Sequence, residues 1–245
     1  PHENTLEFLN LGIDEDELTL SRQAELDQLD KFQVFEEVSA EDYPGVKVIG
    51  TTWVDRRISS SLVKSRLCAQ EFATKKSLQY YSATPSTAYI RIIGFLIARY
   101  NLDSMIADVS GAFLHTPTPA DMTLLVRPPP ESRAARCGLV WRLTKMLYGL
   151  RSSPQAWQDH LHTLLSARGY ERSRHEPCLY FHLEHRVYIL TYVDDLHACG
   201  PREQLLAIVN ELSAHLIIKA SGPFVCGDSY TFLRQSRLVR EDGVY

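Results

Sequence analysis

The sequence predicts an α+β fold in which an antiparallel sheet packs against helices. Apolar residues recur with helical spacing in some segments and alternate with polar residues in others, so both helices and strands are expected. The strand-like segments lie close together along the chain, which favours hairpins. Helices and hairpins are interleaved in a mixed order, and this order argues against a doubly wound parallel sheet.

The first part of the chain predicts one helix and three strands. Residues 13–31 begin with acidic residues and then place leucines at helical spacing, which predicts an amphipathic helix. The next segment, FQVFEEV, is strand-like. Residues 46–58 and 61–72 are rich in β-forming residues and meet at a run of serines, so we expect a hairpin. Lys64 and Arg66 lie two apart in its second strand, so both side chains should leave the same face.

The rest of the chain predicts three more helices and several short strands. One helix follows Pro85, with Ser86 or Thr87 as its N-cap. A short strand then runs to Asp108, and the proline-rich stretch after it admits only the short strand MTLLV. The remaining elements are a helix over 153–168, strands over 177–184 and 186–193, a helix over 202–216, and two short strands in the tail.

Composition narrows the class of protein. The 245 residues are 44% hydrophobic, enough for one large domain or two smaller ones. Residues 1–42 have a charge balance of −11 and the remainder +7, so the body suits either a polyanionic partner or an ordinary solvated surface. Five scattered cysteines without a C-x-x-C pair indicate a reduced, intracellular compartment. No apolar run reaches about 18 residues, and the N-terminus does not resemble a secretory signal, so we expect no membrane contact.

Two adjacent aspartates, Asp194 and Asp195, lie between the apolar stretches YILTYV and LHAC. A plain hairpin turn is one interpretation, because Asp favours turns. The apolar flanks instead suggest the tip of a buried hairpin, where acidic side chains need a cation. Asp108 also ends an apolar stretch. If the fold brings the three carboxylates together, they could hold two metal ions for displacement at phosphorus.

Several segments together resemble the Ty1/copia-type reverse transcriptases of long-terminal-repeat retrotransposons. The motifs are DVSGAFLH, LYGLRSSPQAW and YVDDL, preceded by LDKFQVFEEV, VIGTTWV and VKSRLCAQEFA in the same order. The resemblance covers residues 24–245 and leaves 1–23 as an acidic extension. It implies a right-hand polymerase fold. The implied parts are fingers at about 24–100 and within 115–155, palm at about 101–114 and 156–225, and the start of a thumb or primer-grip region at about 226–245.

The resemblance also implies the site and its ligands. Asp108, Asp194 and Asp195 would be the catalytic, metal-binding acids. They would bind two Mg²⁺ ions, or Mn²⁺ instead of Mg²⁺. The substrates would be deoxynucleoside triphosphates and a primer on an RNA or DNA template. Integrase and RNase H domains of a polyprotein would be further partners, in a cytoplasmic particle or the nucleus. The implied substrate-binding residues are Lys64 and Arg66 for the triphosphate, Phe113 for exclusion of the 2′-hydroxyl, and Tyr148, Gly149 and Arg151 near the nascent base pair. The alternative for Phe113 is an ordinary core aromatic, and the alternative for Lys64 and Arg66 is a solvated strand face.

Four positions depart from the family pattern: Glu71, Thr116, Ser152 and Arg234. Glu71, Thr116 and Arg234 replace glycines, and Ser152 replaces a glutamine. Arg234 replaces the glycine of the primer-gripping turn, and it puts that turn in doubt because arginine tolerates positive φ poorly. These departures motivate an alternative, a decayed or co-opted copy that binds nucleic acid without extending primers. A nuclease using the same acids is a second alternative, and it leaves LYGLRSSPQAW and Phe113 as packing only.

Overall fold

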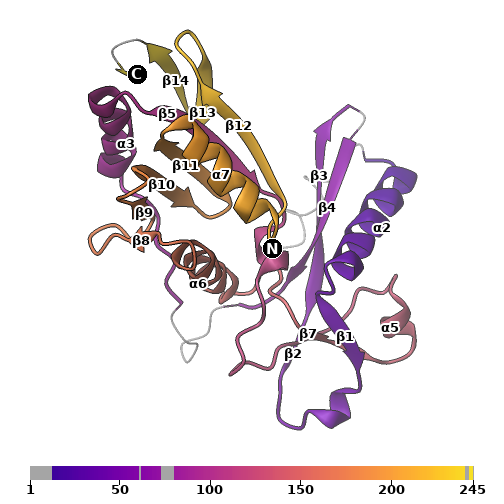
Figure 1. Cartoon of the computed structure of the whole chain (residues 1–245). Helices are drawn as coiled ribbons and strands as arrows, with labels where there is room; N and C mark the ends of the chain where they lie inside the picture. The colour runs from indigo at the N-terminus through magenta and orange to yellow at the C-terminus, as the bar shows by residue number, and fades with distance from the viewer. Residues whose placement is uncertain (1–12, 61, 73–79, 241–242, 245) are drawn as a thin grey trace. The chain divides into compact units, whose positions relative to one another are not determined.

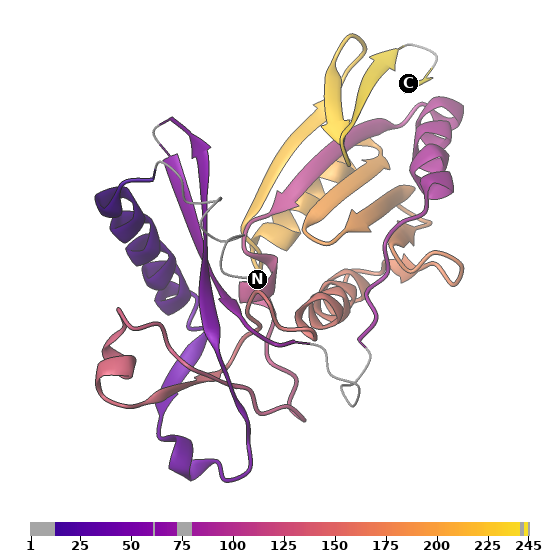
Figure 2. The same cartoon turned by 180° about the vertical axis from the view of Figure 1, so that it is seen from behind.

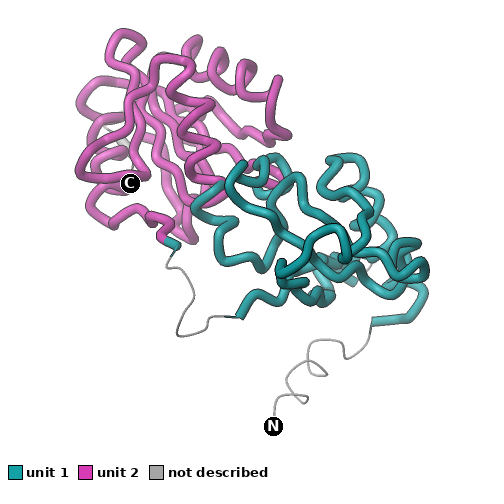
Figure 3. The backbone as a smooth tube through the Cα atoms, turned by 90° about the horizontal axis from the view of Figure 1, so that it is seen from below, with its two compact units in different colours: residues 1–80, 113–156 teal, residues 81–112, 157–245 magenta. Residues whose placement is uncertain are grey.

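The computed structural model describes residues 13–60, 62–72, 80–240 and 243–244 (Figure 1; seen from behind in Figure 2). The chain divides into two compact units, unit 1 with residues 1–80 and 113–156 and unit 2 with 81–112 and 157–245 (Figure 3). Residues 1–12 of the predicted acidic extension lie outside the described residues. Helix α2 (Glu15–Lys31) runs without a break through the predicted domain start at residue 24.

Unit 1 contains a long hairpin covered by helix α2. The predicted strands are confirmed as β3 (Thr51–Ser59) and β4 (Leu62–Ala69), and β4 alternates between exposed and buried residues. Its free edge is closed by side chains of α2. Ser21 accepts a hydrogen bond from the Ser65 N–H and donates one to the Val63 carbonyl, at 2.8 and 3.0 Å, and Glu25 accepts one from the Leu67 N–H. An unpaired strand edge is thereby satisfied without a further strand.

A second, four-stranded sheet in unit 1 has the order β1-β7-β6-β2. Its strands are β1 (Phe35–Val38), β2 (Val48–Ile49), β6 (Leu125–Val126) and β7 (Val140–Leu143), and the β2–β6 pair is parallel. Short helices η1 (Ala40–Asp42), α4 (Ala112–His115) and α5 (Arg133–Arg136) lie in the connections, α4 spanning the unit boundary. The rings of Phe35 and Trp141 stack at 3.8 Å in the core beneath this sheet.

Unit 2 is built on a six-stranded antiparallel sheet with the order β12-β5-β11-β10-β9-β8. The strands are β5 (Asp103–Val109), β8 (Glu171–Arg172), β9 (Leu179–His182), β10 (Val187–Tyr192), β11 (Asp195–Gly200) and β12 (Ile218–Phe224). The helices are α3 (Thr87–Tyr100), α6 (Ser153–Ser166), which begins in unit 1 and crosses the unit boundary, and α7 (Arg202–Ser213). The predicted α+β class with an antiparallel sheet is confirmed.

A small sheet from the C-terminal tail packs on the same unit. It consists of β13 (Ser229–Phe232), β14 (Gln235–Arg240) and β15 (Gly243–Val244). Tyr230 and Phe232 join the core formed by α3 and the large sheet. Strand β12 was not predicted, because it is an edge strand that is mostly exposed and lacks alternation. Among the described helices, none is long and apolar enough to cross a membrane.

Candidate active site

The two adjacent aspartates lie at the tip of the β10–β11 hairpin, as predicted. Tyr192 and Asp195 are the last paired residues, so Val193 and Asp194 form the turn. Val193 has φ +52°, a conformation that β-branched residues rarely adopt. Its carbonyl accepts a hydrogen bond from the Trp157 indole N–H at 2.6 Å, and the Asp194 carbonyl accepts one from the Val109 N–H at 2.9 Å. Neighbouring elements therefore hold the turn on both sides.

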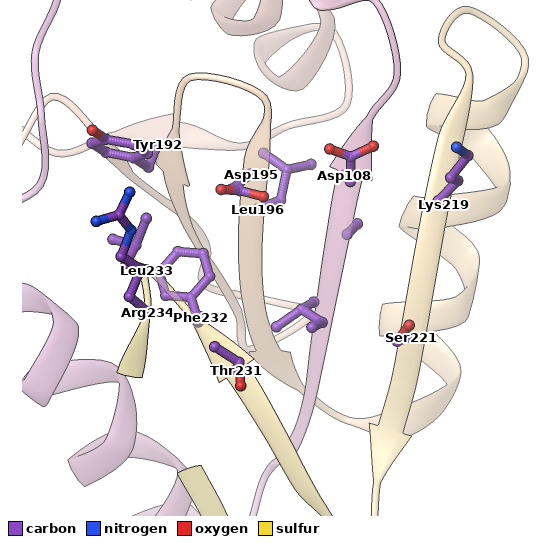
Figure 4. A pocket seen from close by; sticks show the side chains of 12 residues that line it. Asp108, Tyr192, Asp195, Leu196, Lys219, Ser221, Thr231, Phe232, Leu233 and Arg234 are labelled. Atoms are coloured by element: carbon purple, nitrogen blue, oxygen red, sulfur yellow. The ribbon is translucent and has the colours of Figure 1, made fainter. Parts of the chain in front are cut away.

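Strand register brings Asp108 beside Asp195. The two residues are direct partners in the β5–β11 ladder, so their side chains leave the same face of the sheet (Figure 4). Burial raises the pKa of the Asp195 carboxyl, and the negative charges of Asp194 and Asp108 raise it further. Asp195 thus lies close enough to Asp194 and to Asp108 to be repelled by both, whereas only Asp108 and Asp195 line the cleft described below. This repulsion is relieved when a cation binds or when a proton is taken up.

The acids supply oxygen ligands, which suit a hard divalent cation. Within the part of the chain that the structure describes, no three His, Cys, Asp or Glu side chains are grouped to hold a metal ion by themselves. Mg²⁺ usually binds to one or two carboxylates and completes its shell with water and substrate phosphates. The paired carboxylates of Asp108 and Asp195 fit that kind of site.

Both carboxylates line a cleft of about 920 Å³ in unit 2 (Figure 4). Lys219 and Arg234 also line it, together with Tyr192 and Leu233. Lys219 is the partner of Asp108 in the β12–β5 ladder, so Asp108 lies between a cation and a second acid. The sequence indicated neither Lys219 nor Tyr192, because the edge strand has no readable pattern and a tyrosine beside an apolar strand is usually packing.

The β13–β14 hairpin forms one wall of the cleft. Its two-residue turn consists of Leu233 at φ +50° and Arg234 at φ +62°, so the turn that the arginine had put in doubt is formed in this structure. Beneath the hairpin, a buried hydroxyl–imidazole–phenol cluster joins β5, β11 and β13. Ser104 Oγ, His197 Nε2 and Tyr230 Oη lie 2.9–3.0 Å from one another. Burial and the nearby Arg237 lower the pKa of His197 to about 3, so the imidazole is neutral at pH 7.

The substrate-binding residues predicted by the resemblance lie in unit 1, where several of them touch. The Arg66 guanidinium lies 5.0 Å from the centre of the Tyr148 ring, and that ring meets Phe113 edge-on at 5.4 Å. Lys64 is exposed on the same face of β4 as Arg66. The structure therefore groups Arg66, Tyr148 and Phe113, with Lys64 two residues along the strand. The three aspartates belong to the other unit (Figure 3).

Gly149 is required by a close approach of two backbone segments. It has φ +82°, and a Cβ atom there would lie 2.1 Å from the Ala69 carbonyl oxygen. The adjacent Tyr148 carbonyl accepts a hydrogen bond from the Ala69 N–H at 2.7 Å, continuing the satisfied edge of β4. The close approach that the sequence predicted toward nucleic acid is, in this structure, made to β4.

One of the four departures from the family pattern, Glu71, has an internal partner for its side chain. The Glu71 carboxylate accepts a hydrogen bond from the Arg151 backbone N–H at 2.8 Å. Thr116 and Ser152 are buried. The Arg151 guanidinium lies over the Tyr80 ring at 5.9 Å. The Glu71 side chain thus makes a contact within unit 1, so this departure is poor evidence of decay.

In unit 2, two carboxylates at the ends of adjacent antiparallel strands line a cleft that also carries Lys219 and Arg234. This arrangement is suited to phosphoryl transfer. The sequence model of one such family, reverse transcriptase (RNA-dependent DNA polymerase), matches residues 33–225. The chain therefore belongs to the reverse transcriptase family, and the predicted Ty1/copia type is confirmed by its relatives.

The relatives are transposon proteins. The retrovirus-related Pol polyprotein from transposon TNT 1-94 of Nicotiana tabacum is 29% identical over 167 residues, which are 65% of this chain and 12% of that protein. The corresponding polyprotein from transposon RE2 of Arabidopsis thaliana is 30% identical over 173 residues, 66% of this chain and 12% of the relative. The putative transposon Ty5-1 protein of Saccharomyces cerevisiae is 32% identical over 100 residues, 40% of this chain and 32% of that protein. The chain thus spans 12% of the length of the first two relatives.

Proposed function

We propose that this chain is the fingers and palm of a reverse transcriptase that carries out template-directed DNA synthesis. The observation that carries the proposal is the pairing of Asp108 with Asp195 across β5 and β11, with Asp194 in the adjoining turn. Unit 2 would be the palm and unit 1 the fingers of a right-hand polymerase fold. Helix α3 and the β13–β14 hairpin lie in unit 2, so the proposed palm begins earlier and ends later than the sequence predicted.

The three aspartates would hold the metal ions of the reaction. Two Mg²⁺ ions, or Mn²⁺, would lower the pKa of the primer 3′-hydroxyl and stabilise the pyrophosphate leaving group. Asp108 and Asp195 would present their carboxylates from adjacent strands, and Asp194 would do so from the turn. The backbone hydrogen bonds to Val193 and Asp194 support this role, because they fix the turn before any ligand arrives.

Unit 1 would position the incoming deoxynucleoside triphosphate. Arg66 and Lys64 would bind its phosphates, the former with a guanidinium already oriented by the Tyr148 ring. Phe113 would pack beneath the sugar and exclude a 2′-hydroxyl. Its edge contact with Tyr148 supports this role, since the contact limits how far the Phe113 ring can move. Gly149 and Arg151 would shape the backbone beside the nascent base pair.

Primer and template would be the macromolecular partners, with other polyprotein domains beside them. The relatives from transposons TNT 1-94 and RE2 are Pol polyproteins of which this chain matches 12%, and this share supports a protein with further domains such as integrase and RNase H.

Primer extension tests the proposal directly. The purified chain is incubated with a DNA primer on an RNA template, deoxynucleotides and Mg²⁺, beside Asp194→Asn and Asp195→Asn variants. Extension by the parent and its loss in both variants is the expected result. Binding without extension would leave a nucleic-acid-binding relic, and degradation of the template would indicate a nuclease. A longer chain that includes the following segment is tested in parallel, because a thumb could be needed for activity.

A further inference from the structure

The outer side of helix α3 carries exposed arginines and exposed aromatic rings. Arg91, Phe95 and Arg99 follow one another at four-residue spacing, so their side chains lie on one side of the helix. Phe95 is 63% exposed and Tyr100 is 47% exposed, although the opposite side of the same helix is buried in the core of unit 2. A group of exposed apolar side chains is typical of a binding surface, whereas single ones are common on any surface.

A further arginine reaches this helix from another segment. The Tyr100 ring lies near two guanidiniums, with the Arg99 Cζ atom 5.4 Å and the Arg186 Cζ atom 5.7 Å from the ring centre. Arg186 belongs to the turn between β9 and β10, so the cluster joins two distant parts of the sequence. Contacts of this kind hold a guanidinium against a ring while its N–H groups can still donate to a ligand. We refer to Arg91, Phe95, Arg99, Tyr100 and Arg186 as the α3 surface.

The arginines of the α3 surface have no acidic partner in the part of the chain that the structure describes. No carboxylate there lies within salt-bridge distance of Arg91, Arg99 or Arg186, and all three side chains are exposed. By contrast, Arg22 and Arg57 in unit 1 are each paired with an acid, at 2.7 and 2.6 Å. The three guanidiniums of the α3 surface are therefore available for an anionic ligand.

The α3 surface is separate from the candidate active site. Arg186 directly precedes β10, whereas Asp194 and Asp195 follow the other end of that strand. The six residues of β10 span about 20 Å. None of the five residues of the α3 surface lines the cleft that contains Asp108 and Asp195. The proposed polymerase reaction thus leaves this surface unused.

We infer that the α3 surface binds single-stranded nucleic acid outside the catalytic cleft. Guanidinium groups bind phosphodiester oxygens, and exposed aromatic rings stack against unpaired bases, so the combination matches a single strand. The bases of a double helix are already stacked on one another and offer Phe95 and Tyr100 no such partner. The inference goes beyond the proposed polymerase reaction, and it holds for RNA or DNA because both strands supply phosphates and bases.

Binding of a single strand tests the α3 surface. Anisotropy of a fluorescein-labelled oligouridine RNA is followed over a range of salt concentrations, in EDTA and without primer or deoxynucleotides. The chain is compared with Arg99→Gln, Phe95→Ala and Arg202→Gln. Arg202 is the matched control, because it is an exposed arginine of the same unit on a different helix, α7, and has no acidic partner among the described residues. An oligodeoxythymidine strand is measured in parallel.

The two α3 variants should weaken binding in different ways. Arg99→Gln should bind about three- to tenfold more weakly, and the slope of log affinity against log salt should fall by about one, because a phosphate contact is lost. Phe95→Ala should bind at least about fivefold more weakly with an unchanged slope, because stacking releases no counterions. Arg202→Gln should bind like the parent. The Tm of each variant should stay within about 2 °C of the parent, because the substituted side chains are exposed.

Photo-crosslinking locates the bound strand. The same RNA with 4-thiouridine in place of one uridine is irradiated with the chain, while an excess of unlabelled blunt RNA–DNA duplex competes for the catalytic cleft. Mass spectrometry then identifies the cross-linked peptides. Cross-links to the peptide that contains Phe95 and Tyr100 are the expected result.

Three results overturn the inference: no binding of single strands by the parent, parent-like binding by both α3 variants, or no cross-links to α3. The exposed rings would then be left for a protein partner. The assay is independent of the proposed function, because binding in EDTA requires no reaction. Single strands that bind through α3 without primer extension would count against the polymerase alone.

Discussion

The two units position their candidate residues by different means. In unit 2, Asp108 and Asp195 are paired by the hydrogen-bond register of two strands, so the backbone decides that they meet. In unit 1, Arg66, Tyr148 and Phe113 meet through contacts between side chains above a closely packed backbone. Placement by register survives the loss of neighbouring side chains, whereas placement by packing depends on each neighbour.

The largest effect is expected from Gly149→Ala in unit 1. The new Cβ would clash with the Ala69 carbonyl and the residue would be held at φ +82°, so the unfolding free energy should fall by about 3 kcal/mol or more. Urea unfolding measures the change. Gly45→Ala is the control, because it has the same φ of +82° with nothing within 4 Å and should cost about 1 kcal/mol. Equal costs would show that the contact with β4 is unimportant.

Tyr230→Phe tests whether strand register in unit 2 keeps the Asp108–Asp195 pair in place when a neighbouring side-chain contact is lost. Removing the hydroxyl leaves Ser104 and His197 with fewer buried partners, which should cost about 1–2 kcal/mol. Amide hydrogen exchange should quicken in β13 and β14 but not at the Asp108–Asp195 pair, because register holds that pair. Tyr192→Phe, at a side chain 37% exposed, should change stability by less than about 0.5 kcal/mol. Faster exchange throughout β5 and β11 would contradict placement by register.

Val193→Gly should stabilise the chain by about 0.5–1 kcal/mol. Glycine tolerates the φ of +52° that strains valine, and the Trp157 hydrogen bond goes to the backbone carbonyl and is therefore retained. Thermal unfolding measures the gain. A loss of stability would mean that the valine side chain contributes packing that outweighs its strain.

The smallest effect concerns the pH dependence of unit 1. Burial raises the pKa of Glu25, although its hydrogen bond from the Leu67 N–H opposes the shift. The folded chain therefore takes up this proton at a higher pH than the unfolded chain does. The Glu25 contribution to stability should rise as pH falls from neutrality towards the ordinary pKa of 4.5. Glu25→Gln should remove this dependence in urea unfolding curves recorded across that range, and an unchanged dependence would contradict it.

The sequence predicted the elements that have strong periodicity and the acids that have unusual neighbours. Helix α2, the β3–β4 hairpin and the β10–β11 turn follow from alternation, helical spacing and a charged pair between apolar runs. Strand β12 was missed because an exposed edge strand needs no apolar alternation, and Lys219 was missed with it. The Ser104–His197–Tyr230 cluster depends on three distant segments, so local pattern carries no sign of it. The hydrogen bond from the Arg151 N–H to the Glu71 carboxylate was hidden for the same reason.

The pairing of β5 with β11 restricts which changes in length the chain can accept. Deleting one residue before Asp108 in β5 would turn the Asp108 carboxylate to the opposite face of the sheet. A residue next to Asp108 would then pair with Asp195. The turn between β9 and β10 ends at exposed Arg186, at the opposite end of β10 from Asp195. This turn could lengthen without altering the pairing of β5 with β11. Active reverse transcriptases related to this chain should therefore vary in length at the β9–β10 turn and keep β5 and β11 at constant length.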